Sequence, residues 1–132
     1  MPGSSSAYKT IKDRRDFLAA RDGFRVHKPP FVLQARHRPA SQQGSTGVRF
    51  GFTVTKKIGN AVKRNRIKRR LREAVRAQPL QVLQALGSRD VVLIARRDAL
   101  NTPFDKLCGH LGASLQVVVA NGRSNGQNPR NS

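Results

Sequence analysis

The strongest hydrophobic period in the chain lies between residues 60 and 76. Four apolar side chains recur there at positions i, i+4, i+7 and i+8, namely Ile67, Leu71, Ala74 and Val75. This spacing places side chains on one face of an α-helix. Pro79 follows, and the residue before a proline disfavours helical backbone angles. The pattern therefore predicts a helix that begins near residue 60, ends before Pro79 and buries one apolar face.

Two segments with a period of two residues predict strands. Residues 31–36 alternate between an apolar face and a mixed face, and the mixed face holds Val32, Gln34 and Arg36. Residues 48–55 alternate in the same way, and their polar face holds Arg49, Gly51, Thr53 and Thr55. A shorter strand is expected at residues 24–27, and residues 39–47 are expected to form a turn-rich loop.

Residues 90–96, DVVLIAR, form a nearly continuous apolar run. Such a run is typical of a central strand that is covered on both faces. Because the helix at residues 60–76 separates this strand from the one before it, the two strands are predicted to be parallel and joined by a crossover. A further helical turn is expected at residues 80–86.

Helices are also expected at both ends of the folded region. Asp13 is placed to cap the first one, and Gly23 is placed to stop it. Thr102 is expected to cap the last helix, with Pro103 at its first position. The buried side of that helix is predicted from four residues, Phe104, Leu107, Leu111 and Leu115.

The order of these elements predicts a single α+β domain, an α/β sandwich in which helices cover one sheet of about four strands. A length of 132 residues with 37% hydrophobic residues fits one domain with a modest core. Residues 1–9 and 121–132 are small and polar and are expected to be disordered, which leaves residues 10–120 as the domain.

Positive charge is concentrated on the predicted helix at residues 60–76 and the turn before it. The chain carries 26 basic and 7 acidic residues, a net charge of +19. Ten of the 26 lie in residues 55–76 beside a single acid, Glu73, and they are Lys56, Lys57, Lys63, Arg64, Arg66, Lys68, Arg69, Arg70, Arg72 and Arg76. Like charges four residues apart repel in an isolated helix. The pattern therefore indicates a surface that binds a polyanion, with nucleic acid as the first candidate.

Membrane and secreted environments fit the sequence poorly. No stretch approaches 18 consecutive apolar residues, and the first twelve residues lack the apolar core of a secretory signal. The lone cysteine, Cys108, cannot form an internal disulfide. These features favour a protein of the reducing cytoplasm that has no membrane partner, and the high charge favours a monomer in the absence of RNA.

The residue types that carry out catalysis are dispersed in the sequence. Three of the seven acids belong to the first helix, Glu73 lies among arginines, and the others are placed as caps or turns, namely Asp90, Asp98 and Asp105. The sequence has no cysteine and histidine spacing for zinc, no phosphate-binding loop and no serine nucleophile motif. One alternative is that His27 and His37 form an acid and base pair for RNA cleavage without a metal. A binding protein is the simpler interpretation.

The place of the basic helix in the chain favours RNA over duplex DNA. A helix-turn-helix protein would place a short second helix in the major groove, whereas this helix lies between strands. The neighbouring sheet face carries Gln34, Thr53 and Thr55, and a polar face beside a basic helix suits a single strand. Phe17 is the best-placed aromatic side chain for stacking on a base, and packing in the core is its alternative role.

Residues 56–73, KKIGNAVKRNRIKRRLRE, resemble the protein component of bacterial ribonuclease P, whose signature is an arginine-asparagine-arginine helix after a lysine-rich IGNAV turn. Arg64, Asn65 and Arg66 match that signature, and weaker similarity covers residues 10–118. The resemblance implies the element order αβββαβα with a left-handed crossover, although about 98% of such crossovers are right-handed. It also implies that an RNA subunit with bound metal cleaves the 5′ leader from precursor tRNA. The protein would bind that RNA and the leader and broaden the range of substrates.

The charge pattern and the resemblance together assign two groups of binding residues. The RNA-binding group consists of Lys56, Lys57, Arg64, Asn65, Arg66, Lys68, Arg69, Arg70, Arg72 and Arg76. The leader cleft consists of Phe17, Val32, Gln34, Thr53 and Thr55. The expected partners are ribonuclease P RNA and precursor tRNA. No residue is assigned to catalysis or to a metal held by the protein alone, and Mg²⁺ is expected in the RNA–protein complex. A basic structural ribosomal protein is the alternative, because it would have the same charge and the same lack of catalytic groups.

Overall fold

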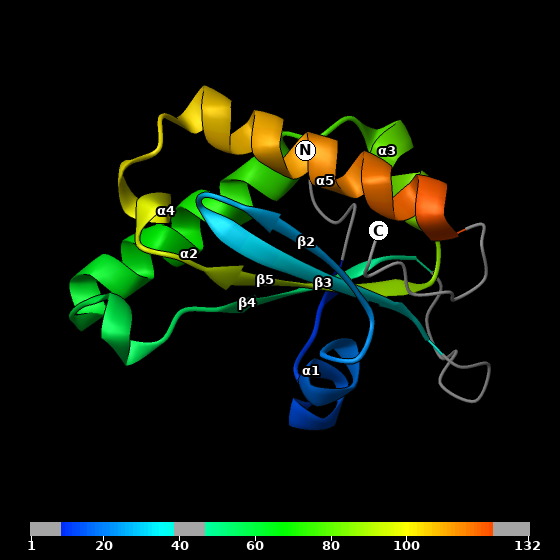
Figure 1. The fold of residues 1–132 in the computed structure, drawn as a ribbon, viewed down its shortest axis with the longest axis horizontal. Coiled ribbons are helices and arrows are strands. Elements are labelled where there is room, and N and C mark those ends of the chain that lie inside the picture. Colours follow the sequence, from blue (N-terminus) through cyan, green and yellow to red (C-terminus); the bar gives the residue numbers. More distant parts are fainter. Residues whose placement is uncertain (1–8, 39–46, 123–132) are drawn as a thin grey trace.

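The computed structural model describes residues 9–38 and 47–122, which fold into one α+β domain (Figure 1). The predicted disordered ends and the loop predicted at residues 39–47 lie almost entirely outside the described residues. In chain order the elements are β1 (Lys9–Thr10), α1 (Arg14–Ala20), β2 (Phe24–Lys28), β3 (Phe31–His37), β4 (Arg49–Thr53), the 3-10 turn η3 (Lys56–Ile58), α2 (Ala61–Arg76), α3 (Leu80–Leu86), β5 (Arg89–Ala95), α4 (Asp98–Asn101) and α5 (Phe104–Gly122).

The strands of the described chain form one mixed sheet with the order β1-β4-β5-β3-β2. β4 and β5 are parallel, which confirms the predicted crossover through α2. β1 is parallel to β4, and β3 is antiparallel to both β5 and β2. The sequence pattern does not predict β1, because two residues are too few to show a period. The hand of the crossover stays a prediction.

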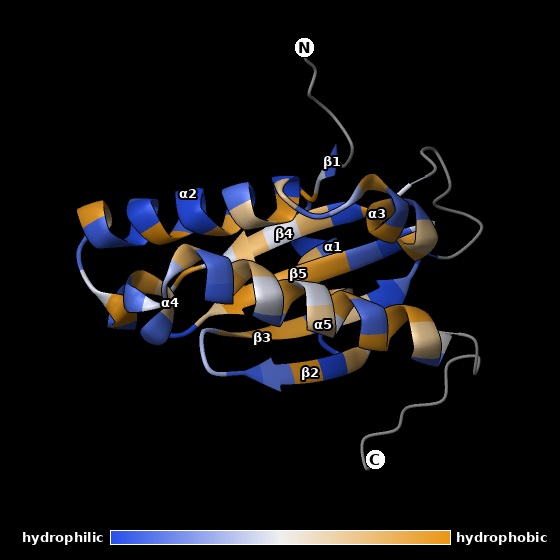
Figure 2. Ribbon diagram, turned by 90° about the horizontal axis from the view of Figure 1, so that it is seen from above, coloured by the Kyte–Doolittle hydropathy of each residue, from blue (hydrophilic) through white to orange (hydrophobic). Residues whose placement is uncertain are grey.

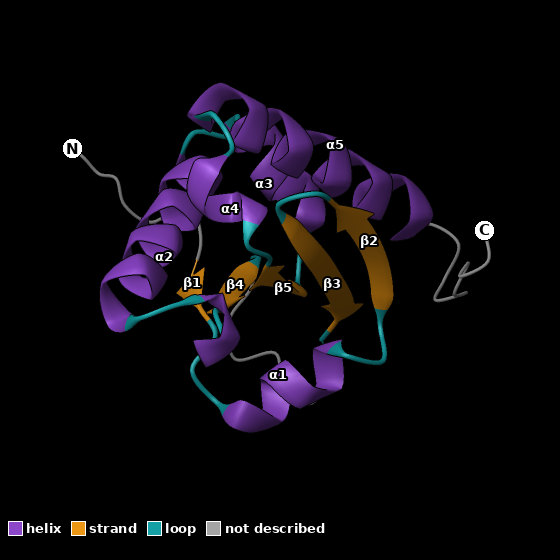
Figure 3. Ribbon diagram, turned by 60° about the vertical axis from the view of Figure 1, so that its left-hand side comes forward, coloured by secondary structure: helices purple, strands orange, loops and turns teal. Residues whose placement is uncertain are grey.

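Helices cover the two faces of the sheet unequally (Figures 1 and 3). α2, α3 and α5 lie on one face, and α1 lies on the other. The main core fills the space between the sheet and the larger helical layer, and its largest fully buried side chains include Phe31, Leu33, Phe50, Ile67, Leu71, Leu93, Leu107, Leu111 and Leu115. The apolar face predicted for α2 is confirmed, because all four of its residues are fully buried.

The helix ends show which of the predicted caps are present. Asp13 caps α1, since its Oδ1 accepts a hydrogen bond from the backbone N–H of Arg15 at 2.9 Å. The predicted N-cap of α5 is wrong, whereas the predicted burial of Leu107, Leu111 and Leu115 is confirmed. The Thr102 hydroxyl donates to the carbonyl oxygen of Asp98 at 2.6 Å and so closes α4. α5 begins at Phe104, one residue after the predicted start, and Phe104 is 41% exposed. The buried side of α5 therefore begins one turn later than predicted.

Candidate nucleic-acid interface

The outer side of α2 presents a row of exposed polar and positively charged side chains, and Figure 2 shows hydrophilic residues along most of this helix. The exposed members are Asn65, Arg66, Arg69, Arg72 and Arg76, with Lys56 and Lys57 exposed in the preceding turn η3 and Lys68 half-buried. The ion pairs of the described residues join arginines outside α2 to Asp13, Asp16 or Asp90. The cations of α2 are therefore not neutralised by those pairs, and their mutual repulsion favours a bound polyanion.

The turn before α2 has a fixed shape. Gly59 has φ +156° and ψ −165°, a backbone conformation essentially restricted to glycine. Asn60 caps α2, because its Oδ1 accepts from the backbone N–H of Lys63 at 3.0 Å. Arg64 is half-buried, and its Nε donates to the carbonyl oxygen of Gly59 at 3.1 Å. The IGNAV segment thus fixes where α2 begins, and part of the Arg64 side chain helps to hold the turn.

Arg70 differs from the other predicted RNA-binding residues. Its side chain is half-buried, and one Nη donates to the carbonyl oxygen of Thr102. This hydrogen bond joins α2 to the connection between α4 and α5. Arg70 is therefore directed toward the protein, whereas Arg69 and Arg72 are exposed to solvent.

The sheet face on which α1 lies is built from three rows of residues in register. The first row is Arg36, Asp90 and Arg49, the second is Gln34, Val92 and Gly51, and the third is Val32, Ile94 and Thr53. α1 covers the first two rows through Asp16 and Phe17. All three residues of the third row are half-buried. We call Val32, Ile94 and Thr53 the open row, because it is the part of this face that remains accessible to a ligand.

The predicted leader-cleft residues have different degrees of exposure. Val32 and Thr53 belong to the open row, and Thr55 is exposed two residues further along the chain. Phe17 is half-buried and packs in a small apolar cluster around Ile11, Ala20 and Val92. Gln34 is only 4% exposed. The surface that this face offers to a single strand thus consists of the open row, Thr55 and the accessible part of the half-buried Phe17 side chain.

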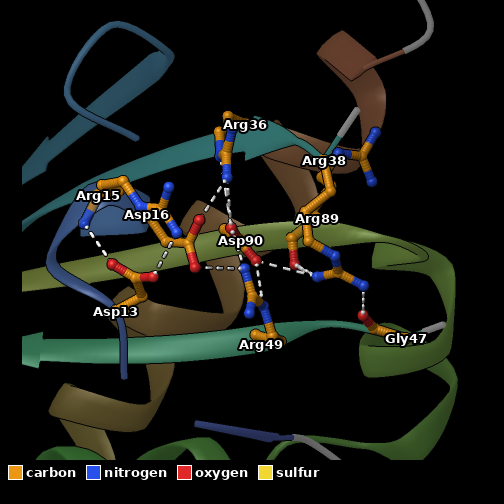
Figure 4. A network of polar contacts seen from close by, with 9 residues as sticks. All are labelled: Asp13, Arg15, Asp16, Arg36, Arg38, Gly47, Arg49, Arg89 and Asp90. Atoms are coloured by element: carbon orange, nitrogen blue, oxygen red, sulfur yellow. Dashed lines mark hydrogen bonds and ion pairs between the residues drawn. The ribbon is translucent and has the colours of Figure 1, made fainter. Parts of the chain in front are cut away.

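Asp90 is the centre of an ion-pair network beneath α1 (Figure 4). Its carboxylate is fully buried and accepts hydrogen bonds from Arg38 at 2.9 Å, from Arg49 at 2.8 Å and from Arg36 at 3.1 Å. Arg36 and Arg49 also pair with Asp16 of α1, each at 3.1 Å. The network therefore ties α1 to three strands of the sheet.

These contacts set the ionisation of Asp90. Burial by itself raises the pKa of Asp90, but hydrogen bonds from Arg49, Arg38 and Arg36 outweigh burial and hold the pKa below its ordinary value of 3.8. The prediction that Asp90 serves as a cap or turn is wrong, because Asp90 lies within β5 and its side chain is buried between the sheet and α1. The sequence contains an indication of this network. Arg36 and Arg49 each lie on one face of a predicted strand, and a charged side chain on a face that is covered by a helix requires a partner of opposite charge.

The two histidines of the alternative acid and base pair are too far apart to act together. His27 is level with Val32 in the β2–β3 pairing, whereas His37 lies five residues further along β3. Five strand residues span about 17 Å. Burial, and then the nearby charge of Arg89, lower the pKa of His37. Nothing in this register brings the two imidazoles to one phosphate.

Three further findings concern metal binding, a possible membrane span and the cysteine. Within residues 9–38 and 47–122, no three His, Cys, Asp or Glu side chains are grouped so that they could hold a metal ion. No helix in the described part of the chain is long and apolar enough to cross a membrane. Cys108 is half-buried, and burial, with a smaller effect of Asp105, raises the pKa of its thiol.

The fold and this surface define a class of protein: a small, strongly basic α+β domain in which one helix presents cations beside a partly covered sheet. Comparison with known proteins places the chain more narrowly. The family model described as ribonuclease P matches residues 6–119. The ribonuclease P protein components of Bartonella quintana and Erythrobacter litoralis are 45% and 47% identical to it over 108 and 106 residues. These matches cover 80% of this chain in both cases and 80% and 82% of the two relatives.

Solved structures agree with the sequence relatives. The RNase P protein of Staphylococcus aureus has a TM-score of 0.66 and 28% identity, and the match covers 86% of this chain and 96% of that one. The RNase P protein from Thermotoga maritima has a TM-score of 0.66 and 27% identity, with coverage of 82% and 96%. The chain belongs to the ribonuclease P protein family. This family supplies the protein component of a ribonucleoprotein endoribonuclease that matures the 5′ end of tRNA.

Proposed function

We propose that the protein assists a catalytic RNA in the endonucleolytic removal of the 5′ leader from precursor tRNA. The exposed face of α2 and the turn η3 bind ribonuclease P RNA, and the open row with Thr55 and the accessible part of Phe17 binds the leader. The RNA carries out the chemistry, while the protein supplies charge and position. The observation that supports this proposal most directly is the face of cations on α2, which follows in the chain immediately after the accessible end of β4.

The cations act by reducing repulsion between RNA strands. From Asn65 to Arg76 the exposed face of α2 spans about 16 Å at 1.5 Å per residue. Each phosphate that a lysine or arginine neutralises releases condensed counterions, and the binding constant then falls with salt by about 0.7 to 0.9 log units per log unit for each contact. Two RNA molecules can therefore approach one another along this helix at a lower electrostatic cost.

The sheet is proposed to position the leader. A leader that lies along the open row is held in one orientation, so the phosphate to be cleaved is presented to the RNA with less loss of entropy in the reacting step. Mg²⁺ is expected in the complex. The described residues do not offer a grouped set of ligands for it, so the RNA is expected to hold the metal.

The test is cleavage of precursor tRNA by the RNA subunit at low magnesium, with and without the protein. We expect the protein to stimulate leader removal, because its cations replace part of the charge screening that magnesium otherwise provides. An unrelated protein of similar net charge serves as the control and separates this function from that of a basic ribosomal protein. No stimulation beyond that control would contradict the proposal, and so would cleavage by the protein after stringent removal of RNA.

A further inference from the structure

A cavity of about 380 Å³ lies at the end of the sheet where β2 turns into β3 and β5 passes into α4. In Figure 1 this turn and α4 lie at the same end of the molecule as the start of α2. The cavity is lined by His27, Lys28, Pro29, Arg96, Arg97 and Asp98. At about 30 Å³ for each water molecule of the liquid, it holds on the order of a dozen waters, which is enough for a polar group and part of its hydration shell.

The lining of this cavity is predominantly positive. Lys28, Arg96 and Arg97 contribute three cations, and Asp98 contributes one carboxylate. The ion pairs found among residues 9–38 and 47–122 use other arginines and leave these three cations without a carboxylate partner. Three like charges around one small space repel each other, and an anion in that space would relieve the repulsion.

Part of the cavity lining continues the accessible part of the sheet face, whereas Lys28, which pairs with Phe31, lines the cavity from the other face. The backbone N–H of Arg96 donates to the carbonyl oxygen of Pro30 at 2.9 Å, which extends the β3–β5 pairing by one residue pair beyond Phe31 and Ala95. Alternation along the strand then places Arg96 on the same face as Ile94 of the open row. His27 lies on that face too, because it pairs with Val32.

Arg97 connects the cavity to the basic segment. One Nη of Arg97 donates to the carbonyl oxygen of Lys57 in η3 at 3.4 Å. Lys56 and Lys57 are both exposed in that turn. The cavity therefore lies between the open row and the beginning of the cationic surface, outside both groups of residues predicted from the sequence.

We propose that this cavity binds a phosphate group of an RNA strand, with Lys28, Arg96 and Arg97 as its ligands. The inference rests on the proposed function, and it adds a site that links the leader surface to the helix α2. Guanidinium groups donate two parallel hydrogen bonds to phosphate oxygens, and lysine supplies a point charge. The strand that occupies the open row is the nearest source of such a phosphate, and the RNA subunit is the other source.

The experiment measures the affinity of the wild-type complex and of three variants for precursor tRNA as a function of salt. The variants are Lys28→Ala, Arg96→Ala and Arg97→Ala. The matched control is Lys106→Ala, because Lys106 is an exposed cation of α5, a helix on the sheet face opposite the open row. Each cavity variant is expected to bind about two- to fivefold more weakly, as for an exposed ion pair. Loss of the phosphate contact reduces the salt slope by about 0.7. Arg96→Lys keeps the positive charge, so it should retain the salt slope of the wild type. Asp98→Asn removes the one carboxylate of the cavity lining, so it should strengthen binding.

Two comparisons between RNAs identify which molecule supplies the phosphate. If it belongs to the leader, the loss is seen with precursor tRNA and is absent for mature tRNA and for the RNA subunit alone. If it belongs to the RNA subunit, the loss is seen with that RNA in the absence of precursor. Either result supports a phosphate site in the cavity. Unchanged affinity and slope in all three variants, while the wild type stimulates cleavage normally, would overturn the site and leave the proposed function intact. Failure of the wild type to stimulate would overturn both.

Discussion

The ring of Phe17 lies directly against the backbone of Gly51. Its Cε1 and Cζ atoms are 2.6 and 2.7 Å from the position that a Cβ atom at residue 51 would occupy. Real Cβ atoms do not approach other heavy atoms that closely, so position 51 has no room for a side chain while Phe17 keeps its place. This contact holds α1 on the sheet and sets how much of the neighbouring open row is covered.

Gly51→Ala is expected to destabilise the protein mainly through this contact, with a smaller effect from Ile11, whose Cδ1 lies 3.3 Å from the same position. The backbone of Gly51 does not require glycine, since its φ lies outside the positive range. Inserting a methyl group into a filled site costs about 1 to 3 kcal/mol, which urea unfolding would measure. Phe17→Ala in the same chain should restore part of the loss, and strict additivity of the two substitutions would show that the contact is not responsible.

Phe17→Ala tests whether the half-buried ring contacts the leader. Stacking on a base is worth about 1 to 3 kcal/mol, so affinity for precursor tRNA should fall more than affinity for mature tRNA. Stability should also fall, because the ring is half-buried against Ile11 and Val92. Equal weakening with both RNAs, together with a loss of stability, would assign Phe17 to packing only.

Asp90→Asn is expected to remove about 3 to 5 kcal/mol of stability, because it leaves the buried Arg38 and the half-buried Arg36 and Arg49 without their main counter-charge. Asp13→Asn is the matched control. The Asp13 side chain is 45% exposed, and asparagine caps a helix as well as aspartate does, so this variant should unfold at nearly the wild-type urea concentration. A similar midpoint for both variants would contradict the role of the network.

The same network predicts a pH dependence. The folded-state pKa of Asp90 is lowered from 3.8, so the carboxylate contributes stability above that pH and loses its contribution as the pH falls below it. The free energies of unfolding of wild type and Asp90→Asn should therefore differ at neutral pH and converge below about pH 4. A difference that stays constant across this range would show that ionised Asp90 is not the stabilising group.

Arg69 and Arg70 are adjacent in the sequence but should respond differently to replacement by alanine. Arg69→Ala removes an exposed cation, so it should reduce the salt slope of RNA binding by about 0.7 to 0.9 and leave stability unchanged. Arg70→Ala removes a charged donor to the Thr102 carbonyl, so it should lower stability by about 1.5 to 3 kcal/mol. RNA titrations at several salt concentrations, paired with thermal unfolding, would separate the two roles. Arg72→Ala should behave as Arg69→Ala does.

Local patterns in the sequence predict the secondary structure well and the sheet-face contacts poorly. The period of Ile67 and Leu71 identifies α2 and its buried side, because helix geometry relates residues that are close in the chain. The partners of Asp90 are 41 to 54 residues away, and no local pattern reveals which strands will be in register. The burial of Gln34 has the same cause: its place beneath α1 depends on how the sheet and helix pack.

In the candidate site, too, features formed by neighbouring residues can be predicted from the sequence, whereas contacts between distant residues cannot. The cations of α2 are visible in the sequence as a cluster, and most of them are exposed as expected. Arg70 lies in the same cluster, but its role depends on Thr102, 32 residues away. The cavity near Arg96 cannot be predicted from the sequence, because β2 and the end of β5 come together only when the sheet assembles.

The anchoring of α1 to Asp90 sets an order for folding during synthesis. α1 leaves the ribosome early, but the strand that carries Asp90 is made only after the whole of α2 and α3. Domains commonly fold from the N-terminus as they emerge, whereas here the first helix has no complete docking surface until β5 is present. The nascent chain therefore carries an α1 whose docking surface is incomplete and a highly charged α2 whose apolar side is only partly covered. Both surfaces are completed when β5 enters the centre of the sheet.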